Sequence, residues 1–238
     1  MEGARAASEA LDAGVRVRFA CATERGLDTP LASKCWTACA DAGVDRLFVS
    51  EDEMLSIADS VTPQGFAVVC EEPRHDLQAV ARSRLTIVLD GIRDPGNVGT
   101  LIRSAAALAA GGAVVLDGSA DPWGTKAVRA SAGMMFRLPV ASAPWSEVER
   151  VIAKAGAVTC VADAAGKPVP LASSWPDRIA LVIGSERSGV RAEARSLAGL
   201  TVAVPMRTGT ESMNAAAAGA VLMWEILRSG RHVTAVPK

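Results

Sequence analysis

The sequence predicts an α/β protein whose parallel sheet is covered by helices on both faces. Short apolar runs rich in β-branched residues recur along the chain, amphipathic helical segments separate them, and glycine or turn residues mark the boundaries. Hydrophobic residues make up 50% of the 238 residues and charged residues 21%, which indicates a globular protein with one large core or two modest ones.

The first 72 residues predict a small α/β domain. Ser50 and Glu53 form a capping-box pattern that opens one of its helices. The charged, proline-containing segment 73–84 is expected to be a linker. The other expected elements are helices at 4–13 and 33–42 and strands at 15–22, 46–50 and 65–70.

Residues 85–238 predict the larger domain. Its strands are nearly continuous apolar runs, as expected for a parallel sheet buried on both sides. The expected strands are 85–90, 113–116, 158–162, 179–183 and 200–204. The expected helices are 99–110, 126–134, 192–198 and 214–228.

Composition excludes several classes of protein. The five cysteines are scattered and form no CxxC pair, which favours a reducing cytoplasm, and buried thiols are the better interpretation of Cys35 and Cys39 than a metal site. No segment suits a secretory signal or a membrane span, so no membrane partner is expected. The net charge of −1 does not by itself indicate a nucleic-acid partner.

Three loops at predicted strand ends carry polar residues, and ligands bind at the carboxyl ends of strands in open parallel sheets. In the loop after residue 89, Asn97 stands where a helix cap is expected, and Arg103 follows in an apolar segment. Arg103 is otherwise explained as a surface cation. In the loop after residue 183, Gly184 permits close backbone approach and Glu186 projects at the sheet edge. Glycine-flanked acidic turns are common, so this pattern alone is weak.

The third loop, residues 204–214, leads from a strand into an alanine-rich helix and contains Glu211, Ser212 and Asn214. Backbone N–H groups at such a helix start are free to bind a ligand. A helix cap made by Ser212 or Asn214 is an equally good explanation of this loop taken alone. The chain lacks GxGxxG after its first strand and lacks GxxxxGK[ST], and neither histidine lies near these loops. Common nucleotide sites and a Ser/His/Asp hydrolase are therefore disfavoured.

Taken together and in order, the loops resemble the three signature motifs of the SpoU (TrmH-like) branch of the SPOUT RNA methyltransferases. The motifs are carried by Asn97, Gly99 and Arg103, by Gly184, Glu186 and Gly189, and by Pro205, Met206, Ser212, Met213 and Asn214, with the segment 129–133 as a further patch. Residues 4–70 resemble, less closely, the L30e-like RNA-binding domain of rRNA-directed members. Because Glu2–Arg5 resembles a point inside that domain, its first helix or arm is expected to be absent.

The resemblance implies S-adenosylmethionine-dependent methylation of an RNA ribose 2′-hydroxyl, a C-terminal trefoil knot and a homodimer to which the last helix contributes. It implies no metal. Arg103 would be the central catalytic residue, Asn97 would orient it, and Glu186, Ser212 and Asn214 would complete the active site. The adenosyl group would contact the main chain around the following residues: Ala162, Gly184, Val204, Met206 and Met213.

Four cations are candidates for RNA contacts: Lys126, Arg129, Arg137 and Arg187. Each of these cations taken singly is better explained as a solvated surface charge. The hypothesis is that the four together form an RNA-binding patch, which predicts a steep salt dependence of RNA binding. The L30e-like part favours rRNA, most of all 23S rRNA, as substrate. A tRNA methyltransferase and an antibiotic-resistance rRNA methyltransferase are alternatives within the family. A non-catalytic RNA-binding protein and a small-molecule methyltransferase are the alternatives from other classes.

Overall fold

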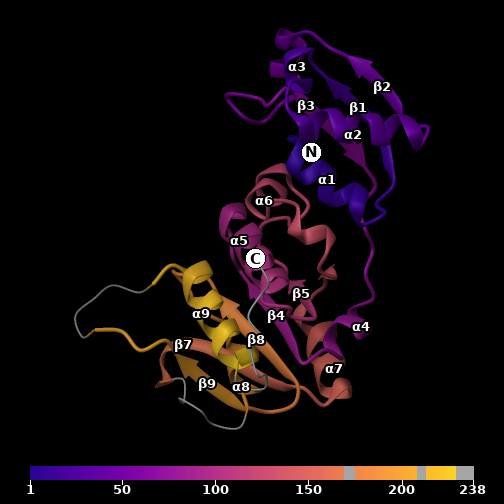
Figure 1. Cartoon of the computed structure of the whole chain (residues 1–238). Coiled ribbons are helices and arrows are strands. Elements are labelled where there is room, and N and C mark those ends of the chain that lie inside the picture. Colours follow the sequence, from indigo (N-terminus) through magenta and orange to yellow (C-terminus); the bar gives the residue numbers. More distant parts are fainter. Residues whose placement is uncertain (169–174, 208–212, 229–238) are drawn as a thin grey trace.

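A computed structural model describes residues 1–168, 175–207 and 213–228, and it contains the expected α/β architecture in two lobes (Figure 1). The larger lobe is built on a six-stranded sheet with strand order β6-β5-β4-β8-β7-β9. Every neighbouring pair in this sheet is parallel. The predicted parallel sheet is therefore confirmed. Its strands are β4 (Leu85–Asp90), β5 (Gly112–Val115), β6 (Val140–Ser142), β7 (Val158–Pro168), β8 (Ile179–Gly184) and β9 (Leu200–Ala203).

Helices cover both faces of this sheet, as predicted. All six residues of β4 are buried, because alternate side chains enter different cores. One core contains Ile87 and the helices α5 (Pro95–Ala107) and α9 (Ala215–Arg228). The opposite core contains Val88 and the helices α4 (Leu77–Ala81), α7 (Trp145–Ala155) and α8 (Ala192–Ser196). The helix α6 (Thr125–Ala130) and the 3₁₀ turn η2 (Met134–Phe136) lie beside α5 and account for the predicted helix at 126–134.

The small lobe contains a three-stranded sheet of order β2-β1-β3, in which β3 is antiparallel to β1. Cys35 and Cys39 are buried in its core, which confirms that they are packed thiols. Ser50 and Glu53 form both bonds of the predicted capping box. Its elements are α1 (Ala4–Asp12), β1 (Val17–Ala22), η1 (Arg25–Leu27), α2 (Pro30–Asp41), β2 (Asp45–Phe48), α3 (Glu51–Ile57) and β3 (Phe66–Cys70).

The structure corrects the sequence interpretation at three places. The expected linker contains α4, whose Leu77 and Val80 are buried against the larger sheet. The segment 140–155, for which no element was predicted, forms β6 and α7. Helix α5 begins at Pro95 with Asp94 as its cap, so Asn97 lies in the first turn instead of capping the helix. Among the described residues, no helix has both the length and the apolarity that a membrane crossing requires.

Candidate active site

The three loops singled out in the sequence meet at one edge of the larger sheet. In the ladder, Asp90 at the end of β4 pairs with Gly184 at the end of β8, and Ala162 on β7 pairs with Ile183 on β8. Since these strands are parallel, the loops that follow them emerge side by side. Helix α9 then packs against α5 and places the end of the third loop next to the first.

A chain of hydrogen bonds connects one residue from each loop. Asn97 Nδ2 donates to Glu186 Oε1 at 2.9 Å, and Asn214 Nδ2 donates to Asn97 Oδ1 at 3.1 Å. The backbone N–H of Ala215 also donates to Glu186 Oε1, at 3.2 Å. The carboxylate of Glu186 thus lies at the N-terminus of α9, where the helix dipole favours negative charge. Residues far apart in the sequence are held as one polar cluster.

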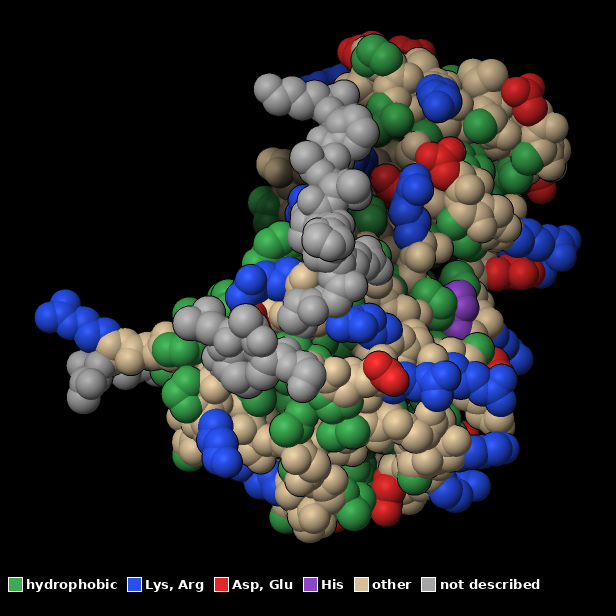
Figure 2. Space-filling model, turned by 60° about the horizontal axis from the view of Figure 1, so that its bottom comes forward, with side chains coloured by type: hydrophobic (Ala, Val, Ile, Leu, Met, Phe, Trp, Pro, Cys, Tyr) green, Lys and Arg blue, Asp and Glu red, His purple; other side chains and the backbone are tan. Residues whose placement is uncertain are grey.

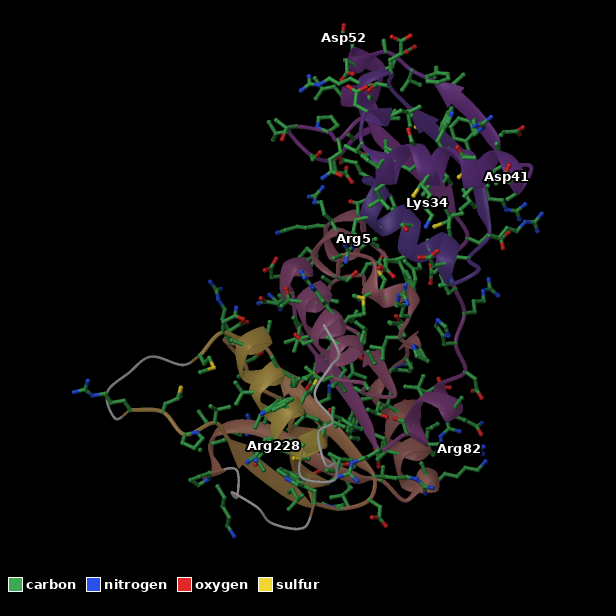
Figure 3. All side chains as sticks on the ribbon, in the orientation of Figure 1. Arg5, Lys34, Asp41, Asp52, Arg82 and Arg228 are labelled. Atoms are coloured by element: carbon green, nitrogen blue, oxygen red, sulfur yellow. The ribbon has the colours of Figure 1, made fainter. Side chains whose placement is uncertain are left out.

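Asn214 also caps α9. Its Oδ1 accepts hydrogen bonds from the backbone N–H groups of Ala216 at 2.9 Å and Ala217 at 3.2 Å. The interpretation of Asn214 as a helix cap is therefore confirmed. The cap uses only the Oδ1 atom of this side chain, because Nδ2 donates to Asn97 instead. Ser212 lies outside the described residues. Arg228 lies at the other end of α9 (Figure 3), and it pairs with Glu225.

A pocket of about 220 Å³ opens next to this cluster, between the middle of β7, the ends of β8 and β9 and the first turns of α9. Much of its wall is apolar. Its lining includes all five residues expected around the adenosyl group, namely Ala162, Gly184, Val204, Met206 and Met213, together with Glu186. Two charged residues in the lining, Asp163 and Arg195, were not among the predicted site residues. Among the described residues, no group of three His, Cys, Asp or Glu side chains is placed to hold a metal ion.

Gly184 allows the chain to fold tightly at the mouth of the pocket. A Cβ atom at this position would lie 2.2 Å from the carbonyl carbon of Gly189 and 2.4 Å from the backbone nitrogen of Val190. Both neighbours are backbone atoms, so no side-chain rearrangement would relieve the clash. The sequence suggested that glycine at this position would allow close approach of a ligand. The structure shows instead that the loop's own backbone at Gly189 and Val190 makes the close approach.

Arg103 stands apart from the cluster. It is exposed on α5, about 9 Å along the helix axis from Asn97, and it is not part of the pocket lining. Among the described residues, no hydrogen bond or ion pair joins Arg103 to another residue. Within this part of the chain, its exposed position fits the explanation as a surface cation.

Three of the four cations suggested for RNA contacts already have carboxylate partners. Lys126 Nζ lies 3.1 Å from Asp94 Oδ1. Arg129 pairs with Glu2 at 3.8 Å, and Arg137 pairs with Glu9 and Asp12 of α1. The two arginines thus link the larger lobe to the small lobe. Arg187 is exposed in the loop after β8.

Arg191, which follows that loop, is partly buried and paired with carboxylates. Arg191 donates to both carboxylate oxygens of the buried Asp90, at 2.6 Å from its backbone nitrogen and 2.8 Å from Nε. Partial burial alone would lower the pKa of Arg191, but its bonds to Asp90 and Asp117 outweigh this and raise the pKa above the ordinary value. This residue therefore anchors the second loop to the end of β4.

Comparison with known proteins identifies two families along the chain. The profile described as the SpoU rRNA Methylase family matches residues 84–224, and the profile described as RNA 2′-O ribose methyltransferase substrate binding matches residues 1–75. The chain is 33% identical to the 23S rRNA (guanosine(2553)-2′-O)-methyltransferase RlmP of Bacillus subtilis, over 78% of this chain and 74% of that protein. It is 31% identical to a 23S rRNA (uridine(2479)-2′-O)-methyltransferase of Streptomyces viridochromogenes, over 80% of this chain and 70% of that protein.

Solved structures share the fold over nearly the whole chain. An AdoMet-bound rRNA methyltransferase from Sinorhizobium meliloti superposes with a TM-score of 0.85 at 26% identity, covering 99% of this chain and 87% of that one. The SpoU methyltransferase AviRb from Streptomyces viridochromogenes, in complex with AdoMet, gives a TM-score of 0.82 at 28% identity, with coverages of 97% and 89%. Both proteins bind the cofactor that the sequence motifs imply.

Proposed function

This chain belongs to the SpoU rRNA methylase family and is an S-adenosylmethionine-dependent RNA 2′-O-methyltransferase, and from this premise we propose that its substrate is 23S rRNA. The supporting observation is that relatives matched over both lobes are named for 2′-O-methylation of 23S rRNA. The polar cluster Asn97–Glu186–Asn214 beside the pocket supports a catalytic chain rather than a non-catalytic RNA-binding protein.

The test is transfer of a tritiated methyl group from S-adenosylmethionine to unmodified total RNA, followed by separation of tRNA from rRNA. Label is expected in 23S rRNA, and blocked primer extension then locates the modified ribose. Label in tRNA alone would contradict the proposal and favour the tRNA alternative. Methylation at a ribosomal antibiotic site, with a higher inhibitory concentration in expressing cells, would favour the resistance alternative.

The pocket suits the cofactor. We propose that the main chain around Ala162, Gly184, Val204, Met206 and Met213 contacts its adenosyl group. Met206 and Met213 both line the pocket and are partly exposed, at 40% and 38%. When bound, S-adenosylmethionine supplies an electrophilic methyl group on a sulfonium. The residues of the chain orient the acceptor hydroxyl and dispose of its proton.

In the proposed active site, Asn97 holds Glu186 and Asn214 in fixed positions, and Ser212 completes the group. We assign to Arg103 the role of binding the RNA phosphate next to the target ribose. A guanidinium stays protonated in proteins, so it is a poor general base, whereas its planar fork matches phosphate oxygens. The exposed position of Arg103 suits a partner that arrives with the substrate.

Phosphate contacts are proposed to lie mainly on the larger lobe. Residues 1–75 contain seven Arg and Lys against thirteen Asp and Glu, whereas residues 76–238 contain eighteen against thirteen. On the face shown in Figure 2, acidic side chains (red) are spread over the small lobe, and basic side chains (blue) lie along the rim of the larger one. Since backbone contacts need local positive charge, Arg187 and Lys126 remain the better candidates for RNA contacts than Arg129 and Arg137, which link the lobes.

A homodimer is proposed through α9. The helix exposes Val221 and Trp224, at 44% and 47%, whereas Leu222 and Leu227 are buried within the protomer and cannot reach a partner. A tryptophan beside a second apolar residue on a helix surface is typical of an interface. Sedimentation equilibrium at micromolar concentration should give twice the chain mass, and a monomer would refute the assignment.

A trefoil knot and the division into residues 1–72, 73–84 and 85–238 are also proposed, with 73–84 as a connection whose helix α4 packs on the larger lobe. The return of the chain from edge strand β9 to α9, which packs on α5, supports the knot. An experimental structure that traces residues 185–214 would decide whether this segment threads a loop. The thiols, none of them in a disulfide, support a reducing compartment such as the cytoplasm.

Two substitutions at Asn214 separate its cap from its link to Asn97. Asn214→Asp keeps the oxygen that caps α9 and removes the Nδ2 donor, so we expect stability within about 0.5 kcal/mol of wild type and a large loss of activity. Asn214→Ala removes both functions and should also lower the free energy of unfolding by about 1 kcal/mol. Thermal unfolding and methyl-transfer rates measure the two effects. Full activity in Asn214→Asp would mean that Asn214 is merely a cap.

A further inference from the structure

An ion pair forms part of the pocket wall on the side of β7. Arg195 Nη1 donates to Asp163 Oδ2, and Arg195 Nε donates to the carbonyl oxygen of Val190 at 2.9 Å. The other oxygen of Asp163, Oδ1, accepts from the backbone N–H of Ala165 at 2.9 Å. Three hydrogen bonds thus fix the orientation of two side chains that both line the pocket.

Asp163 retains unused hydrogen-bonding capacity. An ionised carboxylate accepts about four hydrogen bonds, and Asp163 uses one lone pair on each oxygen. The side chain is 16% exposed, so most of its surface is shielded from bulk water while it borders the pocket. Such a group is suited to accept hydrogen bonds from hydroxyls of a ligand inside the pocket.

The position of Asp163 in the pocket indicates which part of the cofactor its carboxylate would contact. It follows Ala162, which is paired with Ile183, so its carboxylate lies on the strand beside the one that ends at Gly184. The apolar wall formed by Ile183, Val202 and Leu222 suits a flat, apolar ring. Glu186, which also lines the pocket, belongs to the proposed active-site cluster where the methyl group would be transferred. In the cofactor, the ribose lies between the purine and the sulfonium, and it is the part that carries hydroxyl groups.

We propose that the Asp163 carboxylate accepts hydrogen bonds from the ribose hydroxyls of the adenosyl group, and that Arg195 acts as a positioning residue for this carboxylate. The inference rests on the cofactor pocket proposed above. Acceptance of ribose hydroxyls by a carboxylate carried on the sheet is a recurrent solution in α/β nucleotide sites. Gly189 contributes indirectly to the position of Arg195. A Cβ at this residue would lie 2.6 Å from Arg195 Nη2, and the φ of +65° also disfavours other residues there.

The test compares binding of four ligands to the full-length protein by calorimetry: S-adenosylhomocysteine, its 2′-deoxy and 3′-deoxy analogues, and methylthioadenosine, which keeps the ribose but lacks the amino acid. Asp163→Ala should weaken binding of S-adenosylhomocysteine and of methylthioadenosine by about 10- to 100-fold alike. For the deoxy analogue that lacks the bonded hydroxyl, wild type and variant should bind with equal affinity. The matched control is Asp177→Ala, an exposed carboxylate outside this pocket, which should stay within about twofold of wild type.

The possible outcomes distinguish a failure of the ribose assignment from a failure of the proposed cofactor pocket. If Asp163→Ala loses affinity for S-adenosylhomocysteine but not for methylthioadenosine, the carboxylate binds the amino-acid end of the cofactor and the proposal is wrong. It is equally wrong if both deoxy analogues keep the full effect of the substitution. If the wild-type protein binds none of the ligands, the proposed cofactor pocket itself fails. Asp163→Asn, which preserves the shape of the side chain, should show the same ligand pattern with a smaller loss, and this guards against misfolding of the alanine variant.

Discussion

Replacing Arg103 by alanine is expected to lower the rate of methyl transfer by about 10²- to 10³-fold while leaving S-adenosylmethionine affinity within about twofold of wild type. The rate should fall because the guanidinium would otherwise hold the RNA phosphate beside the reacting hydroxyl. The affinity should persist because Arg103 is exposed and outside the pocket lining. Single-turnover methylation and calorimetry measure the two quantities.

The lysine and control variants sharpen this experiment. Arg103→Lys keeps the charge but loses the planar fork, so it should recover little of the activity. Arg150→Ala removes an exposed arginine from α7, on the opposite face of the sheet, and should leave activity unchanged. Loss of cofactor binding in Arg103→Ala would show that the residue supports the pocket and would overturn its assignment to the RNA phosphate.

Gly184→Ala is expected to abolish cofactor binding, with at least a 100-fold loss of affinity, and to lower the free energy of unfolding by about 1–3 kcal/mol. The added methyl group would overlap the backbone of Gly189 and Val190, so the loop between residues 184 and 190 must move. This loop carries Glu186 and forms one wall of the pocket. Calorimetry with S-adenosylhomocysteine and thermal unfolding provide the measurements.

Gly124→Ala is the matched control for this substitution. Its φ is −59°, and the nearest atom to an added Cβ is Asp121 O at 3.3 Å, so the methyl group is nearly accommodated. We expect wild-type affinity and a change in stability below about 1 kcal/mol. Near-normal cofactor binding in Gly184→Ala would show that the loop tolerates displacement and that close packing at Gly184 is dispensable for the pocket.

Local signals account for the elements that were predicted correctly. Strand β4 is a continuous apolar run, and Ser50 and Glu53 specify a helix start within four residues. Where the prediction failed, the signals were weaker or were misread. Helix α7 has its buried residues, Trp145, Val148 and Ile152, at helical spacing, but it follows a strand of only three residues. In α4 the charged surroundings masked a short apolar face.

The structure brings part of the predicted site together. Asn97, Glu186 and Asn214 and the five pocket residues were predicted from the resemblance of their loops to the family motifs, and these residues lie close together in the fold. Asp163 and Arg195 were missed because neither follows a glycine or a cap signal. Their pairing depends on β7 and α8 lying side by side, which no local pattern encodes.

By itself, the sequence determined the α/β class, the order of most elements, the family motifs and the loops that carry them, because these depend on short-range periodicity and on residues with special backbone or capping properties. Only the tertiary structure decided which side chains meet. Asn97 lies 89 residues from Glu186 and 117 from Asn214, yet hydrogen bonds join them. Partners at such separation are chosen by strand order and helix packing, which bring distant loops to the same edge of the sheet.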